Sequence, residues 1–154
     1  MKIRILCVGK VKEDFYRKRM EELSAQIQKR AGLEIIEVED EKTIEGGSPA
    51  ELQKIRELEG NRLKRYLTKE EGELRIALCI DGTKYSGEEW NHKIKQKIND
   101  SGIKQLTYVI GGSIGMDESV IRMADIQLSF SDMTFPHQLM RVLLLEQIAQ
   151  ADYL

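Results

Sequence analysis

Residues 128–141 read LSFSDMTFPHQLMR, and the rest of the sequence is interpreted outward from this stretch. The apolar residues at its start predict a buried strand over 126–130. Pro136 predicts the beginning of a final helix, because proline is favoured in the first helical turn. The intervening residues therefore form a loop at the carboxyl end of a strand, which is where open α/β folds bind their ligands.

Two other predicted strands end in loops of the same kind. Residues 106–110 lead into GGSIG at 111–115, and residues 74–80 lead into DGTK at 81–84. Neither a dinucleotide-binding fingerprint nor a phosphate-binding P-loop is present. Because glycine lets backbone N–H groups approach a ligand closely, the three loops together favour an adenosine-type ligand. A tight connection between a strand and a helix is the alternative for each loop.

The remaining sequence alternates between strand and helix patterns. Further strands are expected at 3–8 and 33–38. The apolar residues within 16–27 predict a first helix, which Gly32 is expected to end. A capping box at 48–51 predicts a second helix that runs to about 67, and another box at 86–89 predicts the beginning of a third. A short helix is expected over 117–123. This alternation predicts one α/β domain over 1–154 with a mostly parallel sheet, its helices covering both faces or one face and a partner chain. The acidic run at 37–45 is expected to be a solvated loop.

The last predicted helix is apolar around most of its circumference. Its apolar residues are Leu139, Met140, Val142, Leu143, Leu144, Leu145 and Ile148. A helix that is apolar on all sides must be buried on all sides, which is difficult in so small a domain. We therefore expect one side to pack on the sheet and the other to form a homodimer interface. A central helix wrapped entirely by its own chain is the alternative.

Composition narrows the classes of protein to consider. The formal net charge of −2 argues against a general nucleic-acid binder, although it permits one local RNA site. No apolar run is long enough to span a bilayer, and the N-terminus lacks the pattern of a signal peptide. The two cysteines lie in apolar runs and no Cys/His cluster is present. We therefore expect a cytoplasmic protein with no membrane partner and no metal.

Two side chains of the last helix are candidates for chemistry. The positive end of the helix dipole should lower the pKa of His137, and a neutral imidazole there could donate or accept a proton. Capping a local backbone group is the alternative. Arg141 lies four residues later on the same helix face. It could hold a phosphate, bridge to a partner subunit, or pair with a nearby carboxylate.

At these residues the sequence resembles the SPOUT superfamily of methyltransferases. Within it, the chain is similar to the bacterial large-subunit rRNA pseudouridine N3-methyltransferases, the RlmH family. The stretches that carry this resemblance are KIRILCVGK at 2–10, ELEG at 57–60, VIGGSIG at 109–115, LSFSDMTFPHQLMR at 128–141 and EQ at 146–147. They span nearly the whole chain, and the stretch at 128–141 is the most specific.

The resemblance implies an α/β fold with a C-terminal trefoil knot that binds S-adenosyl-L-methionine, and a homodimer with a composite active site. It implies cofactor contacts at Leu78, Gly111, Phe130, Ser131, Asp132, Met133, Thr134 and Phe135. The implied reaction is metal-independent methylation of N3 of a pseudouridine in 23S rRNA, with naked rRNA or the assembled ribosome as substrate. His137 would orient or deprotonate the base, and Arg141 would supply a supporting charge.

Two other functions stay open at this point. Family members usually continue after Gln147 with an aromatic-Arg-Ala run and a basic tail, whereas this sequence reads IAQADYL at 148–154. A cofactor-binding dimer that is catalytically impaired by an altered or truncated C-terminal tail is therefore one alternative. An α/β enzyme acting on a small nucleotide-like substrate is the other, and the acidic net charge favours it.

Overall fold

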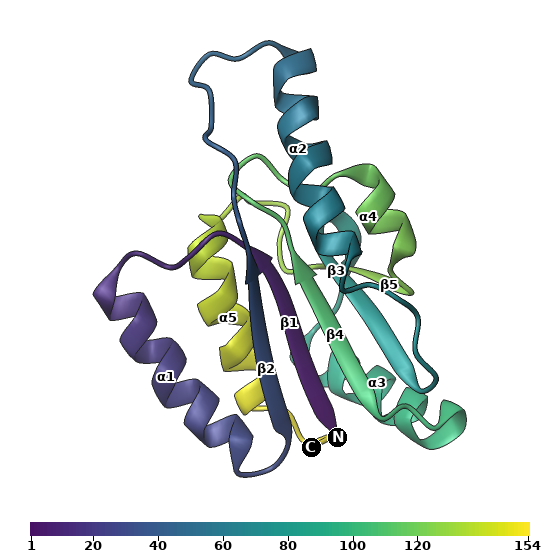
Figure 1. Ribbon diagram of the computed structural model, residues 1–154. Helices are drawn as coiled ribbons and strands as arrows, with labels where there is room; N and C mark the ends of the chain where they lie inside the picture. Colours follow the sequence, from purple (N-terminus) through teal and green to yellow (C-terminus); the bar gives the residue numbers. More distant parts are fainter.

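Five parallel strands form a single sheet in the computed structural model, which describes all 154 residues (Figure 1). The strands are β1 Lys2–Val8, β2 Gly32–Val38, β3 Glu73–Lys84, β4 Gln105–Ile110 and β5 Ile126–Ser129. Their order across the sheet is β2-β1-β4-β3-β5, and every neighbouring pair is parallel. The expected parallel α/β architecture is confirmed. All strand carboxyl ends therefore lie at one edge, where the connecting loops can meet.

Four helices connect the strands and a fifth follows β5: α1 Asp14–Gln28, α2 Pro49–Lys64, α3 Gly87–Ser101, α4 Glu118–Met123 and α5 His137–Ala149. Both expected capping boxes are present, because Ser48 and Ser86 each accept a hydrogen bond from the backbone N–H three residues later.

Two boundary expectations were wrong. Helix α1 ends at Gln28 rather than at Gly32. Gly32 instead begins β2, where its N–H donates to the carbonyl of Met1 at 3.0 Å. The acidic run is not a loop from its first residue either, since Glu37 and Val38 belong to β2. Pairing with β1 begins β2 at Gly32, one residue before the expected strand, whereas β2 ends at Val38 as the strand pattern predicted.

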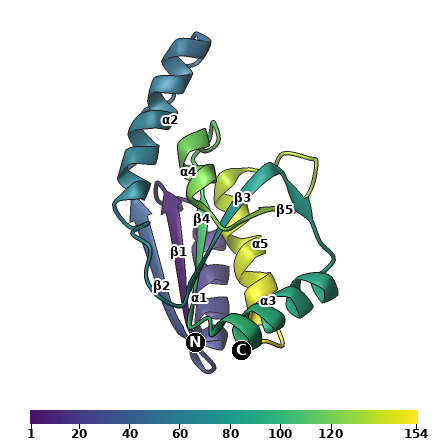
Figure 2. The ribbon, with the colours of Figure 1, turned by 90° about the vertical axis from the view of Figure 1, so that its right-hand side faces the viewer.

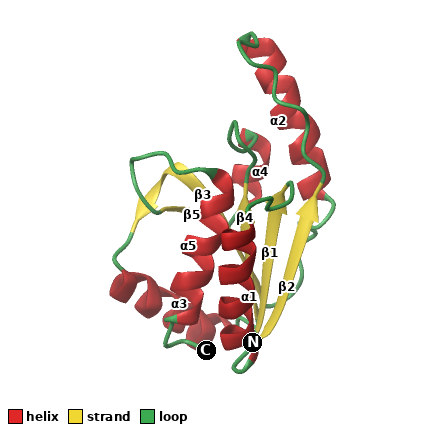
Figure 3. Cartoon of the chain, turned by 90° about the vertical axis from the view of Figure 1, so that its left-hand side faces the viewer, coloured by secondary structure: helices red, strands yellow, loops and turns green.

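Helices cover both faces of the sheet (Figure 2). Alternate side chains of β1 divide between them, with Ile5 and Cys7 in the larger core under α1, α3 and α5, and Leu6 and Val8 in the smaller core under α2 and α4. Helix α5 lies beside α1 in the larger layer (Figure 3). Its own chain buries Val142, Leu144, Leu145 and Ile148 of α5, and leaves Leu139, Met140 and Leu143 only partly covered.

Strand β3 continues past residue 80, where a turn at Asp81-Gly82 was expected. Its pairing with β5 shifts register between Leu78 and Thr83, so residues 79–82 form an irregularity within a longer strand. An added Cβ at Gly82 would lie 2.7 Å from the carbonyl carbon and oxygen of Gln127. Glycine is therefore needed for close backbone approach there, and its turn-like appearance in the sequence was misleading.

None of the helices has both the length and the apolar character that crossing a membrane requires.

Candidate functional site

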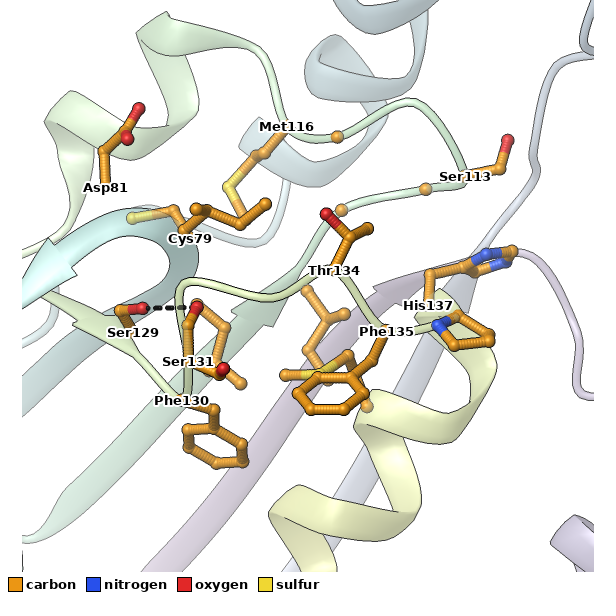
Figure 4. Close-up of a pocket in the computed structure, with 18 of the residues that line it drawn as sticks. Cys79, Asp81, Ser113, Met116, Ser129, Phe130, Ser131, Thr134, Phe135 and His137 are labelled. Atoms are coloured by element: carbon orange, nitrogen blue, oxygen red, sulfur yellow. Dashed lines mark hydrogen bonds between the residues drawn. The ribbon is translucent and has the colours of Figure 1, made fainter. Parts of the chain in front are cut away.

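An irregular part of β3 and the loops after β4 and β5 converge on one cavity of about 740 Å³ at the carboxyl edge of the sheet (Figure 4). Residues 78–81, 110–116, 128–131 and 133–137 line it, together with Ile121 and Met140. The sequence predicted ligand-like loops after three strands. The structure brings the three regions together, but residues 78–81 belong to β3 rather than to a loop. The volume lies within the range of about 300–1,000 Å³ that is typical of small-molecule and cofactor sites.

The loop after β4 folds tightly on itself. The N–H of Gly115 donates to the carbonyl of Gly112 at 3.1 Å, and Gly115 has a φ of 92°. An added Cβ at Gly111 would lie 2.8 Å from the backbone nitrogen of Met116 and 2.9 Å from the carbonyl carbon of Gly115. Because backbone atoms cannot move aside as a flexible side chain can, position 111 requires glycine to keep this conformation.

Internal hydrogen bonds also fix the loop after β5. The Ser129 hydroxyl donates to the carbonyl of Ser131 at 3.1 Å, and the N–H of Met133 donates to the Ser131 hydroxyl oxygen at 3.0 Å. Asp132 is exposed, forms an ion pair with Lys84, and does not line the cavity. Met133 is 73% exposed. This loop thus presents one ordered turn to the cavity. The Met133 side chain lines the cavity and is also largely exposed to solvent.

His137 lines the cavity from the first residue of α5. Burial lowers its pKa from the ordinary value of 6.5, and the nearby charge of Arg141 lowers it further, while Asp40 acts in the opposite direction. Its ring makes no hydrogen bond to the protein, so the alternative that it caps a local backbone group is not supported. The side chain is therefore a neutral, unpaired imidazole at neutral pH, free to bond a ligand.

Arg141 does not line the cavity; its side chain is buried in the core. Its guanidinium donates to Glu37 Oε2 at 2.7 Å and to the carbonyls of Val8 and Gly9 at 2.6 and 2.8 Å. Pairing with a nearby carboxylate was one of the expected alternatives, and this is the contact that the structure shows. Arg141 thus links α5 to the end of β1, and its charge lowers the pKa of His137.

Most of the expected site residues share the cavity. Those that line it are Leu78, Gly111, Phe130, Ser131, Met133, Thr134, Phe135 and His137. The sequence did not single out Met116, Ile121 and Met140, which also line it. Met140 lies three residues after His137, so helical spacing could have found it. Met116 and Ile121 carry no such signal. No group of three or more His, Cys, Asp or Glu side chains could hold a metal ion.

A second cavity of about 300 Å³ adjoins the first and shares Leu128, Phe130 and Phe135 with it. Its other walls are mostly aromatic and aliphatic, and they include Trp90 of α3 and Leu143 of α5. Apolar surface thus continues from the rim of the larger cavity onto α5.

The chain is similar to known proteins over nearly its whole length. A family model described as "Predicted SPOUT methyltransferase" matches residues 1–152. The ribosomal RNA large subunit methyltransferase H of Bifidobacterium animalis subsp. lactis is 45% identical over 151 residues, which are 98% of this chain and 93% of that protein. The protein of the same name from Acetivibrio thermocellus is 43% identical over 148 residues, 96% of this chain and 91% of its own.

A solved structure shares the fold at much lower identity. It is that of a Legionella pneumophila protein described as a methyltransferase in complex with the cofactor SAM. The two chains superpose with a TM-score of 0.52 at 11% sequence identity. The match covers 96% of this chain and 65% of the other, so this chain spans about two thirds of that protein's length.

Proposed function

The chain belongs to the SPOUT methyltransferase family, and from this premise we propose that it methylates N3 of a pseudouridine in large-subunit ribosomal RNA, using S-adenosyl-L-methionine. The family resemblance predicted from the sequence is confirmed by the model that matches residues 1–152 and by relatives at 43–45% identity. Those relatives are named as ribosomal RNA large subunit methyltransferases, which supports an rRNA substrate.

The observation that carries the proposal is the cavity formed by the irregular part of β3 and the loops after β4 and β5. It has room for an adenosine-type cofactor, with a volume of about 740 Å³, and its walls combine apolar side chains with glycine backbone. The cofactor supplies a methyl group that its sulfonium already activates. The protein must therefore hold the acceptor in line with that methyl group and keep competing water away.

His137 is the best candidate for handling the proton of the acceptor. N3 of pseudouridine must lose a proton when it gains a methyl group, and a neutral imidazole can accept one or orient the base through a hydrogen bond. The lowered pKa of His137 keeps the ring neutral at the pH of the cell. Arg141 supports this role as a positioning residue, because it links α5 to β1 and disfavours protonation of the ring.

We also propose the features that the family resemblance implies, beginning with a homodimer. A second copy would cover the partly exposed Leu143 and the apolar cavity beside it, giving a homodimer with the two active sites near the interface. The match to the SPOUT family over residues 1–152 supports a C-terminal trefoil knot. Activated methyl transfer needs no metal, and an rRNA substrate supports a cytoplasmic location in our proposal.

The test is methyl transfer from radiolabelled cofactor to ribosomes, to naked rRNA and to free pseudouridine, with and without a chelator. We expect transfer to an RNA substrate, unchanged by the chelator, and at least about a hundredfold slower in His137→Gln. Transfer to the free nucleoside alone would favour an enzyme of small nucleotide-like substrates. Cofactor binding without transfer to any acceptor would favour the catalytically impaired dimer.

A further inference from the structure

Helix α2 carries a buried carboxylate that the proposed reaction does not use. Glu59 is only 5% exposed, and its Oε1 has no hydrogen-bond partner. An unpaired buried polar atom costs free energy, so a structure retains one only where something offsets the cost. Glu59 lies in the stretch ELEG at 57–60, which is similar to the family, but the sequence alone predicted no role for it.

The unpaired oxygen faces the glycine loop of the cavity. An added Cβ at Gly112 would lie 2.7 Å from Glu59 Oε1 and 3.3 Å from its Cδ. The same Cβ would lie 3.2 Å from Val8 Cγ1. Gly112 thus lies close to both the carboxylate and β1, and neither contact leaves room for a side chain at this position.

The carboxylate is itself held in place. Its Oε2 accepts a hydrogen bond from the backbone N–H of Glu41 at 3.0 Å. Arg62 holds the same segment by donating to the carbonyl of Glu39 at 2.9 Å and pairing with the Glu41 carboxylate. Glu59 therefore cannot withdraw from the loop without losing its bond to Glu41.

Helix α2 contacts the loop at other points along its length, and Figure 1 shows the two side by side. Gln53 donates to Asp117 Oδ1 at 2.8 Å, and Arg56 donates to the carbonyl of Ile114 at 3.4 Å. The Thr43 hydroxyl lies 2.9 Å from that of Ser113. These contacts fix the outer part of the loop, whereas Glu59 contacts it at Gly112, next to the end of β4.

We propose that Glu59 is a positioning residue of the methyl-transfer site, whose carboxylate sets the position of the glycine loop through its contact with Gly112. The inference rests on the proposed function, because it assumes that this cavity takes the cofactor. Burial raises the pKa of the Glu59 carboxyl, as expected for a group kept from water at a functional site. A residue that only stabilised the fold would affect unfolding, whereas a positioning residue affects cofactor affinity in a way that depends on Gly112.

A double-mutant cycle on the full chain tests this inference. Calorimetry measures the affinity for S-adenosylhomocysteine in wild type, Gly112→Ala, Glu59→Ala and the double variant. We expect each single change to weaken binding, by about tenfold for Gly112→Ala, because its methyl group displaces the loop from the carboxylate. Removing the carboxylate frees that space, so the double variant should bind at least about threefold more tightly than the two losses multiplied together predict.

Two further variants separate positioning from loss of charge or fold. Glu59→Gln keeps the volume and an acceptor for the Glu41 N–H, and should bind within about twofold of wild type. Lys54→Gln removes an exposed charge on the same helix, away from the loop contacts, and should leave the affinity unchanged. If Gly112→Ala does not fold, the contrast between Glu59→Ala and Glu59→Gln replaces the cycle.

The possible outcomes test the role of Glu59 separately from the proposed function on which it rests. Losses that simply multiply in the double variant, or Glu59→Ala affinity equal to wild type, would overturn the role of Glu59 while leaving the proposed function intact. A wild-type chain that binds no cofactor would instead overturn the proposed function, and this inference with it.

Discussion

His137 shows how a residue's surroundings, rather than its type alone, determine its chemistry. Position in the first turn of a helix already predicted a lowered pKa. The structure gives a different main cause, which is burial, with the charge of Arg141 second. Both effects favour the neutral ring, so the expected direction stands while its explanation changes.

We predict that the midpoint of the His137 titration lies below 6.5, the ordinary value for histidine. Because the role proposed for His137 requires the neutral ring, kcat/KM should be level above pH 6.5 and fall as the pH decreases through this midpoint. A pKa that is lower in the folded than in the unfolded chain also stabilises the fold above pH 6.5, and this contribution is lost through the same lower range. NMR measures the midpoint directly, with exposed His92 as the second histidine signal.

Replacing the neighbouring charge gives the control. Arg141→Gln should raise the His137 midpoint, and His137→Gln should remove the acid limb of the rate profile. A midpoint above 6.5 in the wild type would contradict the placement of His137 beside Arg141 in a buried setting.

Gly111 permits an equally local prediction. Gly111→Ala should weaken cofactor binding at least about tenfold, because the added methyl group meets backbone atoms of residues 115 and 116 within 3 Å and forces the loop open. Gly102→Ala is a matched control, since an added Cβ there meets nothing within 4 Å and the residue lies at the far end of α3. The control carries its own backbone strain at a φ of 62°, so calorimetry should show lower stability but normal affinity. Wild-type affinity in Gly111→Ala would remove this loop from the binding site.

Residues buried by distant parts of the chain were the hardest to interpret from sequence. Arg141 and Glu59 are charged residues at helical positions, and such residues usually face solvent. Arg141 is buried beside Glu37 and the carbonyls of Val8 and Gly9. Glu59 is buried beside Gly112 and the backbone of Glu41. Neither environment is encoded near the residue itself.

At the level of elements, periodicity located every strand and helix but not their full extent. The capping boxes placed the beginnings of α2 and α3 correctly, because the signal and the structure it specifies lie within four residues. Strand β3 runs further than expected because its end pairs with β5, which follows about 40 residues later. Strand ends that depend on a partner strand cannot be predicted from local sequence.

Helix α5 offers a comparison between two neighbouring leucines. Leu145 is fully buried in its own chain, so Leu145→Ala should cost about 2–5 kcal/mol of unfolding free energy at every protein concentration. Leu143 is partly exposed and lines the smaller cavity, so Leu143→Asp should leave the folded chain intact and weaken the proposed dimer. Chemical denaturation and light scattering measure the two effects separately. A Leu143→Asp protein that remains dimeric would place the subunit interface elsewhere.

At the scale of the whole molecule, the sequence predicted the fold class but not the order of the strands in the sheet. Alternating strands and helices predicted a parallel α/β fold, because parallel neighbours need long crossover connections. The strand order was not predictable in the same way. Strand β4 lies between β1 and β3, and nothing in the local sequence distinguishes this order from one in which β3 lies next to β1.

The proposed dimerisation should make the thermal stability of the protein depend on its concentration. If two copies bury the apolar surface beside α5, folding and dimerisation are linked, and the thermal midpoint should rise with protein concentration. Calorimetric scans over a hundredfold range of concentration measure this directly. A midpoint that does not change, together with a monomer mass in solution, would contradict the homodimer.

The contact between Arg141 and the end of β1 has a consequence for the order in which the chain becomes structured during synthesis. The guanidinium binds the carbonyls of Val8 and Gly9 across 133 and 132 residues of sequence. Strand β1 also needs β4, about 100 residues later, on one of its sides. Folding dominated by such distant contacts is slow, and the first strand must leave the ribosome and wait in an incomplete state. Nascent chains should therefore resist proteolysis only after residue 141 has emerged.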